Sequence, residues 1–143
     1  MTVAIRLAAP ADAHAVSVLL NELGYRVPPA QVLASLAAMD VQRADPVFVA
    51  TDKDNVAGLL AVHIARWLQL EKPIARITAL VVQGKYQRRG IGRRLLAHAE
   101  SFAQSAGCGT LELTTAAERD EAQAFYREFG FEHTSIRFKK ALT

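Results

Sequence analysis

The sequence of 143 residues has one cysteine, few aromatic residues and no long apolar run. Because Cys108 has no second cysteine to pair with, no internal disulfide forms, which is typical of a protein from the reducing cytoplasm. The apolar stretches, such as 57–62, are far shorter than the roughly 18 residues of a membrane-spanning helix. No basic segment followed by an apolar one opens the chain, so we expect no signal peptide. A hydrophobic content of 51% still provides a core, and we predict a single cytoplasmic domain over residues 1–143 that contacts no membrane.

Acidic residues are missing between Lys72 and Ala99, a segment that carries seven of the 17 lysines and arginines. The other ten cations face all 14 acidic residues, so the rest of the chain has a net charge of −4, although the whole chain has +3. At the centre of this basic segment, two glycines precede an amphipathic helix. Such glycines expose backbone N–H donors, and the helix dipole adds partial positive charge. Arg93 and Arg94 in the first helical turn each cost about 0.3–1 kcal/mol unless an anion lies nearby. The segment therefore predicts a site for a phosphate or pyrophosphate.

The two glycines, Gly90 and Gly92, also occur in other contexts. They are compatible with a simple turn before a helix. A dinucleotide-binding loop would need a third glycine where Leu95 stands, and Glu112, about 20 residues further on, lies in mid-strand rather than at a strand end. A Walker loop is excluded because no Gly-Lys-Ser/Thr is present. A nucleic-acid-binding stretch over 85–94 would interleave aromatic residues with its cations, and Tyr86 is the only one there.

Hydrophobic periodicity predicts an α/β fold with a mixed sheet, in the order β-α-α-β-β-β-α-β-α-β. Asp12 is a candidate N-cap of the first helix, and the unit over 74–114 should form a right-handed parallel crossover. The predicted strands cover residues 3–7, 47–51, 56–67, 74–82, 110–114 and 131–140, and the predicted helices cover residues 10–24, 28–38, 91–106 and 118–129.

Two motifs resemble those of the GNAT family of N-acetyltransferases. After Val82, the run Gln-Arg-Arg-Gly-Ile-Gly at 87–92 resembles the family's acetyl-coenzyme A signature, Q/R-x-x-G-x-G/A. The run Ala-Gln-Ala-Phe-Tyr-Arg-Glu-Phe-Gly-Phe at 122–131 resembles its second motif, A-x-x-x-Y-x-x-x-G-F. The opening at 5–8 with Asp12, and Val-Ala-Gly at 56–58, are similar to its N-terminal features. The resemblance covers nearly the whole chain and implies the single-domain acyl-CoA N-acyltransferase fold.

The resemblance implies that acetyl-coenzyme A is the co-substrate and that a glycine loop, residues 87–93, holds its pyrophosphate. The implied contacts in this loop are made by Gln87, Arg88, Arg89, Gly90, Ile91, Gly92 and Arg93. The arginine side chains are candidates for the 3′-phosphate or for a solvated basic face. The preceding strand is implied to splay from its neighbour, so that the main chain of Leu80, Val81 and Val82 pairs with the pantetheine arm. One N–H there would polarise the thioester carbonyl. The alternative for these three residues is a core role.

Tyr126 matches the family's residue that protonates the leaving thiolate, a role suited to a phenol, whose ordinary pKa is about 10. It also lies on an apolar helical stripe, so packing is the alternative. Two positions depart from the family's pattern. Arg119 stands where many members have an Asn that contacts pantetheine, so it is either a phosphate contact or a surface residue. The strand 74–82 has no carboxylate for a general base, which leaves Glu112, His63 or ordered water, and both side chains also have structural interpretations.

The sequence thus predicts an N-acetyltransferase in which a primary amine of a small-molecule acceptor attacks the thioester directly. We expect no metal, because no His, Cys and carboxylate cluster has ligand spacing, and no nucleic-acid partner. The acceptor pocket is expected between the first two helices, the segment 66–72 and the chain end. There Arg66, Trp67 and Arg137 favour a small anionic amine such as an aminophosphonate, and the segment 80–142 resembles the small aminoalkylphosphonate acetyltransferases. Protein N-acetylation, a catalytically silent coenzyme A sensor and a nucleic-acid-binding module are the alternatives. Oligomeric state is not readable from the sequence, although dimers are common among domains like this one.

Overall fold

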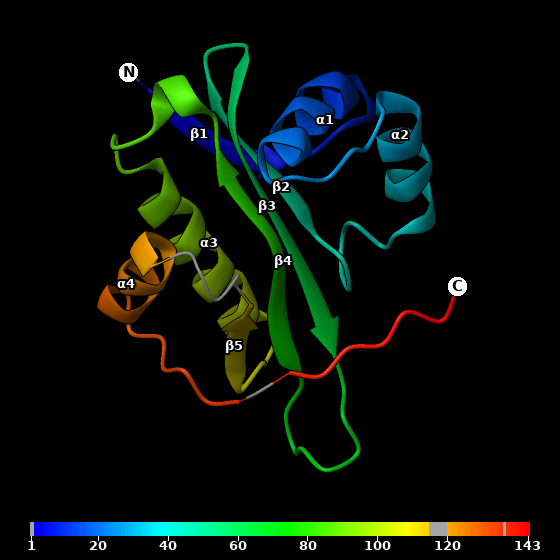
Figure 1. The fold of residues 1–143 in the computed structure, drawn as a ribbon, viewed down its shortest axis with the longest axis vertical. Helices are drawn as coiled ribbons and strands as arrows, with labels where there is room; N and C mark the ends of the chain where they lie inside the picture. Colours follow the sequence, from blue (N-terminus) through cyan, green and yellow to red (C-terminus); the bar gives the residue numbers. More distant parts are fainter. Residues whose placement is uncertain (1, 115–119, 136) are drawn as a thin grey trace.

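The protein is described by a computed structural model that covers residues 2–114, 120–135 and 137–143. Its five-stranded sheet has the order β1-β2-β3-β4-β5, with antiparallel neighbours except for the parallel pair β4 and β5. Helices α1 and α2 lie on one face of the sheet, and α3 lies on the other (Figure 1). The described elements are, in chain order, β1 (Val3–Leu7), the 3-10 turn η1 (Pro10–Asp12), α1 (Ala13–Glu22), α2 (Pro29–Ala38), β2 (Val47–Asp52), β3 (Asn55–Ala65), β4 (Ile74–Val82), the 3-10 turn η2 (Gly84–Tyr86), α3 (Ile91–Ser105), β5 (Thr110–Leu113) and α4 (Asp120–Glu128).

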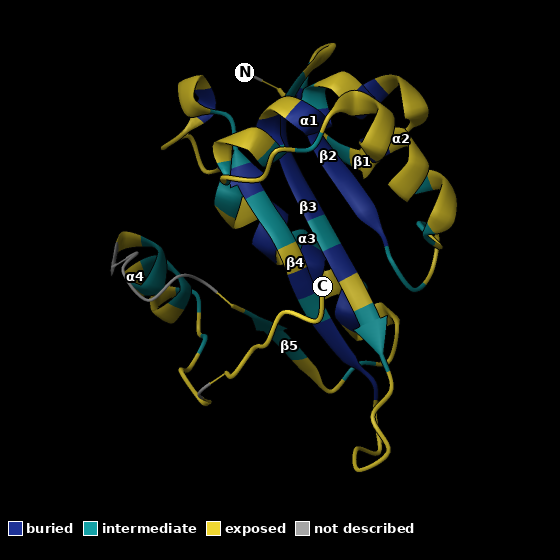
Figure 2. Cartoon of the chain, turned by 45° about the vertical axis from the view of Figure 1, so that its right-hand side comes forward, coloured by how far each residue is buried: buried dark blue, intermediate teal, exposed yellow. Residues whose placement is uncertain are grey.

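The predicted α/β class and the mixed sheet are confirmed, but the predicted final strand over 131–140 is wrong. No strand is assigned to the described residues of this tail. Its apolar side chains Phe138 and Leu142 are 93% and 91% exposed. Because neither side chain is buried against the sheet, the tail gains none of the packing that would hold it as a strand. It instead crosses the sheet near β5 and β4 (Figures 1 and 2).

The sheet separates two apolar cores, and its central strands are buried on both faces (Figure 2). The core on the α3 side includes Leu60, Ala75 and Leu95, and the core on the α1 side includes Leu19 and Val81. Alternate residues of one strand therefore belong to opposite cores, as the period-two geometry of strands requires. Among the described residues, no helix is long and apolar enough to span a bilayer.

Gly58 on β3 allows α3 to approach the sheet closely. A Cβ atom at Gly58 would lie 3.0 Å from Cδ1 of Leu95 and 3.3 Å from the carbonyl oxygen of Val81. Because the second neighbour is backbone, a larger residue could be accommodated only by moving β4 or α3. This contact sets the distance between α3 and the two strands beneath it, and so positions the loop that joins β4 to α3.

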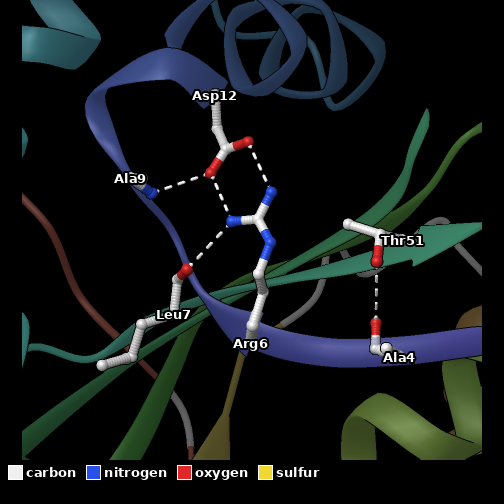
Figure 3. Close-up of polar contacts among 6 residues, drawn as sticks. All are labelled: Ala4, Arg6, Leu7, Ala9, Asp12 and Thr51. Carbon is white, nitrogen blue, oxygen red and sulfur yellow. Dashed lines mark hydrogen bonds and ion pairs between the residues drawn. The ribbon is translucent and has the colours of Figure 1, made fainter. Parts of the chain in front are cut away.

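Arg6 and Asp12 fix the start of α1 against β1 (Figure 3). Arg6 donates from Nη1 and Nη2 to the Asp12 carboxylate at 2.7 and 2.9 Å, and the Ala9 amide donates to its Oδ2 at 2.7 Å. Asp12 stands at the N-cap position of α1 as predicted, but its carboxylate bonds none of the helix amides and turns back to Ala9. The hydrogen bond from Arg6 is the main reason that the pKa of Asp12 is lowered, and the same bond raises the pKa of Arg6.

Candidate active site

The glycine loop has an unusual backbone at two of its residues. Arg88 and Gly90 have φ angles of +63° and +81°, both in the left-handed region. Glycine adopts this region freely, whereas Arg88 does so at a cost of about 1–2 kcal/mol. Left-handed residues that alternate with ordinary ones turn successive N–H groups to the same side, which forms a concave anion-binding surface. The loop therefore has the backbone geometry that a bound phosphate requires.

Five consecutive or nearly consecutive amides of this loop have no hydrogen-bond partner among the residues that the structure describes. The first helical bond of α3 runs from the Arg94 amide to the Gly90 carbonyl at 3.1 Å. The amides without a partner are those of Arg88, Gly90, Ile91, Gly92 and Arg93. Since α3 has 15 residues, its dipole also places partial positive charge at these donors. This arrangement fits a diphosphate bound by backbone donors.

The arginine side chains of the α3 start already have partners within the protein. Arg93 donates to Oε1 of Glu128 at 2.7 Å, and its guanidinium lies 5.8 Å from the ring centroid of Phe125. Arg94 donates to the carbonyl of Val3 at 2.8 Å. These two cations therefore do not need a bound anion to offset the helix dipole, contrary to the sequence argument. The anion site rests on the backbone rather than on these side chains.

A gap opens between β4 and β5 next to the glycine loop. The two strands pair only from Ile74 opposite Thr110 to Ile77 opposite Leu113. Strand β4 continues to Val82, so its second half has no strand partner on the β5 side among the residues that the structure describes (Figure 1). A bound molecule with amide groups can pair with backbone exposed in this way. The splay implied by the resemblance is thus present in the fold.

The strand register determines which backbone groups face this gap. The Gln83 amide donates to the Ala57 carbonyl at 2.8 Å, and Gly58 stands opposite Val82 in the antiparallel pair. Since hydrogen-bonded pairs alternate along such a ladder, Val81 directs its N–H and C=O to β3, while Leu80 and Val82 direct theirs to the gap. The structure therefore places two of the three predicted residues at the gap and turns the backbone of Val81 away from it.

Gln87 donates from Nε2 to the carbonyl of Val82 at 3.3 Å. This bond ties the glycine loop back to the end of β4. The side chain of Gln87 therefore contacts the backbone at the edge of the gap, while its main chain is part of the glycine loop. Its own amide is occupied, because it donates to the Gly84 carbonyl at 3.2 Å.

Helix α4 carries Tyr126 to the side of the glycine loop. The Arg93–Glu128 ion pair joins α4 to α3, and a Cβ atom at Gly92 would lie 3.7 Å from Cζ of Phe125. The ring of Tyr126 is half-buried and packs at 5.5 Å from Phe125 and 5.9 Å from Phe131, measured between centroids. Tyr126 thus packs as the apolar stripe predicts, on the helix that adjoins the loop.

The two candidate bases lie away from the gap, at the paired end of the sheet. Glu112 accepts from Nη1 of Arg76 at 2.6 Å, and Nδ1 of His63 lies 2.6 Å from Oδ1 of Asp45. His63, Arg76 and Glu112 stand opposite one another on three adjacent strands. Along β4, four residues, or about 13 Å, separate the backbone of Arg76 from that of Leu80.

Two sequence predictions remain, the contact of Arg119 with the co-substrate and the absence of a metal. Arg119 lies outside the described residues. No group of three or more His, Cys, Asp and Glu side chains among the described residues could hold a metal ion. The sequence analysis missed the contacts of Arg76, Glu112, Thr114 and Arg137, which come together from two strands and the tail. The only signal in the sequence was the presence of a charged pair on neighbouring strands.

Strands β4 and β5 separate beside a loop whose amides have no partner among the described residues. This arrangement fits an α/β protein that binds a phosphate-containing co-substrate. The family model described as the acetyltransferase (GNAT) family matches residues 16–131, and the chain belongs to this family. It is therefore an acetyl-transferring enzyme, and acetyl-CoA is its co-substrate.

Known proteins agree with this assignment. An aminoalkylphosphonate N-acetyltransferase of Salmonella typhimurium is 33% identical over 124 residues, which cover 87% of this chain and 78% of the relative. The crystal structure of a putative acetyltransferase from Agrobacterium tumefaciens has a TM-score of 0.86 and 27% identity, over 96% of this chain and 99% of that one. An aminoglycoside N-acetyltransferase in complex with CoA has a TM-score of 0.85 at 18% identity, over 99% and 96% of the two chains, and shows the shared fold.

Proposed function

We propose that this enzyme acetylates a primary amine of a small-molecule acceptor by direct attack of the amine on acetyl-CoA. The observation that carries this proposal is the juxtaposition, at the end of β4, of the strand gap with five amides that have no partner in the described part of the chain. The amides fit the diphosphate of the co-substrate, and the gap fits its extended arm. Both features serve the same molecule, and they hold its thioester in one orientation.

In this mechanism the backbone of β4 stabilises the transition state. The Leu80 amide faces the gap and would donate to the thioester oxygen as negative charge develops on it. Val82, two residues further along, would hold the adjacent part of the arm through the same side of the strand. Positioning and carbonyl polarisation then supply most of the rate enhancement, since no covalent intermediate is required.

Tyr126 is proposed to protonate the departing thiolate. Its helix adjoins the start of α3, which supports a location beside the bound co-substrate. The Tyr126→Phe variant keeps the ring packing against Phe125 and Phe131 and removes only the hydroxyl. We expect its kcat to fall by about 10²-fold or more, with CoA affinity unchanged. A kcat equal to that of the wild type would remove Tyr126 from the mechanism.

No side chain is assigned as general base. Glu112 and His63 are each held in a pair, by Arg76 and Asp45, and both lie at the far end of the sheet from Val82. We propose that the amine arrives neutral or loses its proton to water. The rate should then rise with pH toward the pKa of the acceptor amine, and the Glu112→Gln and His63→Gln variants should keep this profile.

The acceptor is proposed to be a small amine that approaches from the α1 side of the sheet. The exposed residues Arg66 and Trp67 lie on the β3–β4 loop beyond the strand ends, and the chain end crosses this face (Figure 2). The Salmonella relative acts on aminoalkylphosphonates by its name, which supports a small anionic amine for this chain as well. Protein N-acetylation is the alternative that the acceptor assay below must test.

Nucleic-acid binding receives no support from the basic stretch. Its one aromatic residue, Tyr86, is 5% exposed and lies between Lys85 and Arg89, at 5.3 and 5.7 Å from the ring centroid. A buried ring cannot stack on a base. The prediction that residues 1–143 form one cytoplasmic N-acetyltransferase domain is retained, and the oligomeric state stays open.

The proposal is tested by thiol release from acetyl-CoA with a panel of amines. The panel should contain aminoalkylphosphonates, amino acids, polyamines, an aminoglycoside and peptides with a free N-terminus. We expect turnover of at least one small amine and none of the peptides. Binding of CoA without turnover of any amine would indicate a sensor and contradict the enzyme proposal, whereas turnover of peptides alone would indicate a protein acetyltransferase.

A further inference from the structure

Two guanidinium groups meet on one hydroxyl where β4 and β5 separate. Arg76 donates from Nη2 to Oγ1 of Thr114 at 3.2 Å, and Arg137 from the tail donates from Nη1 to the same oxygen at 3.3 Å. Thr114 follows the last residue of β5, and the last strand pair is Ile77 with Leu113. The cluster of Arg76, Thr114 and Arg137, called here the fork site, therefore lies at the base of the gap.

The fork site has more positive than negative charge. Among the described residues its one carboxylate is Glu112, which accepts from Nη1 of Arg76 at 2.6 Å. Arg137 has no carboxylate partner among the described residues, and its only recorded bond is the one to Thr114. Like charges repel, so two guanidiniums on one neutral hydroxyl are unfavourable unless an anion offsets them. The Arg76 side chain is 22% exposed, so this cost is not removed entirely by water.

The site also has hydrogen-bond donors to spare. A guanidinium carries five N–H groups. Two of those of Arg76 and one of those of Arg137 are engaged, which leaves donors on both groups, directed from a strand and from the tail. A planar carboxylate is satisfied by one guanidinium fork, whereas three tetrahedral oxygens can accept from two guanidiniums and a hydroxyl together. The donor set therefore favours a phosphonate over a carboxylate.

The fork site lies on the face of the sheet that is proposed to receive the acceptor. Ala75 and Ile77 point into the core under α3, so Arg76 between them points to the opposite face. The gap-facing amide of Leu80 lies three residues beyond Ile77 on the same strand. From the level of Thr114 to that amide the distance along the strand is about 7 Å, or two residues. A guanidinium–oxygen contact of about 2.8 Å and a short carbon spacer fill this distance.

We propose that the fork site binds the phosphonate group of the acceptor and so places its amine, one or two carbons away, at the thioester. This inference rests on the proposed function, because it assigns the acceptor of that reaction. It gives Arg76 and Arg137 a role in specificity, since neither belongs to the glycine loop or the gap-facing backbone assigned to the co-substrate. It also explains why the tail crosses the sheet without forming a strand: Arg137 has to reach Thr114 from the open side.

Binding of methylphosphonate, which has no amine, tests the site without any transfer. Calorimetry is run on protein saturated with CoA, so that the glycine loop is already filled. We expect methylphosphonate to bind, and the Arg137→Gln variant to weaken its affinity about tenfold, as loss of a hydrogen bond between charged groups predicts. Lys139→Gln removes the same charge from the same exposed tail and should leave the affinity within twofold. Acetate should bind at least tenfold more weakly than methylphosphonate.

Equal affinity of wild type and Arg137→Gln, or no binding to the CoA-loaded protein, would overturn the proposal. Binding that disappears when CoA is added would also overturn it, because the anion would then belong to the glycine loop. Acetate as tight as methylphosphonate would contradict the preference for a phosphonate. Arg76→Gln would leave the Glu112 carboxylate without its guanidinium partner, so Thr114→Val serves as the second variant. It should lower the affinity for methylphosphonate without changing the net charge of the protein.

Kinetics separate this inference from the proposed function. With an aminoalkylphosphonate as acceptor, Arg137→Gln should raise KM about tenfold and leave kcat within twofold. With a neutral alkylamine of the same length, the variant should raise KM by a smaller factor than with the aminoalkylphosphonate. A phosphonate site without turnover of any amine would sink the proposed function and leave the site standing. If amines are turned over and Arg137→Gln changes neither kcat nor KM, the proposed function stands and the fork site is refuted.

Discussion

Replacement of Gly90 by alanine tests whether the backbone conformation of the glycine loop determines the affinity for CoA, apart from any effect on the stability of the protein. Gly90 has a φ of +81°, and a Cβ atom there would meet nothing within 4 Å. Gly107, which follows α3 at its other end, has a φ of +80° and equally open surroundings. An alanine in this region costs about 1–2 kcal/mol at either position. For a chain of this length each kilocalorie per mole lowers Tm by about 4 °C.

We therefore expect both variants to lose about 4–8 °C in Tm, and only Gly90→Ala to lose affinity for CoA. A change of φ at residue 90 turns the amides of Gly90 and Ile91 away from a common ligand. Loss of one hydrogen bond to a charged oxygen is worth about 1.5–3 kcal/mol, which corresponds to a factor of about 10 or more in Kd.

Differential scanning fluorimetry gives the two Tm values, and titration calorimetry gives Kd for CoA. Gly107→Ala is the matched control, because it has the same backbone strain far from the loop. Unchanged CoA affinity in Gly90→Ala, together with the expected loss of Tm, would refute the claim that this backbone conformation binds the diphosphate. An equal loss of affinity in both variants would show that affinity follows global stability instead.

Three further predictions concern the scaffold of the site. Asp12→Asn should destabilise the protein by about 1–3 kcal/mol at pH 7, measured by urea unfolding, because Arg6 loses its charged partner. Because the pKa of Asp12 is lowered in the folded state, its carboxylate stabilises the fold fully above the unfolded pKa, and this stabilisation is lost as pH falls through the folded pKa. A difference in unfolding free energy between wild type and Asp12→Asn that persists unchanged below pH 3 would contradict the role given to the Asp12 carboxylate. His98 is partly buried beside Phe48, at 4.4 Å between ring centroids, and this burial lowers the pKa of His98. The free energy of unfolding of the wild type should therefore fall as pH drops below about 6.5. Unfolding curves at pH 5 and 7 should show a smaller pH dependence for the His98→Gln variant. Gly58→Ala should cost about 1–3 kcal/mol, because its Cβ would press on Leu95 and on the backbone of Val81, and a Tm equal to that of the wild type would show that α3 is less tightly packed than described.

The sequence was sufficient for most of the elements and for the position of the glycine loop between β4 and α3. Apolar spacing and glycines define strands and helices locally, so the positions of β4, the glycine loop and α3 followed from residues near in the chain. The positive φ at Gly90 follows from the same local chemistry. The final strand failed because a strand needs a partner, and alternation in residues 131–140 carries no information on whether one is available.

Contacts between distant residues could not be predicted. The partners of Arg93 and Arg94 are Glu128 and Val3, 35 and 91 residues away in the chain. The direction of the Val81 backbone depends on the register with β3, which no single strand encodes. The fork site depends in addition on the path of the tail, which brings Arg137 to Thr114 across 23 residues.

A crystal structure of the enzyme with acetyl-CoA tests the account most directly. The account predicts diphosphate oxygens within about 3.2 Å of the amides of Gly90, Ile91 and Gly92, and a pantetheine arm alongside Leu80 and Val82 in the gap between β4 and β5. A diphosphate held by the side chains of Lys85 and Arg89, with the loop amides still bare and the gap empty, would contradict it.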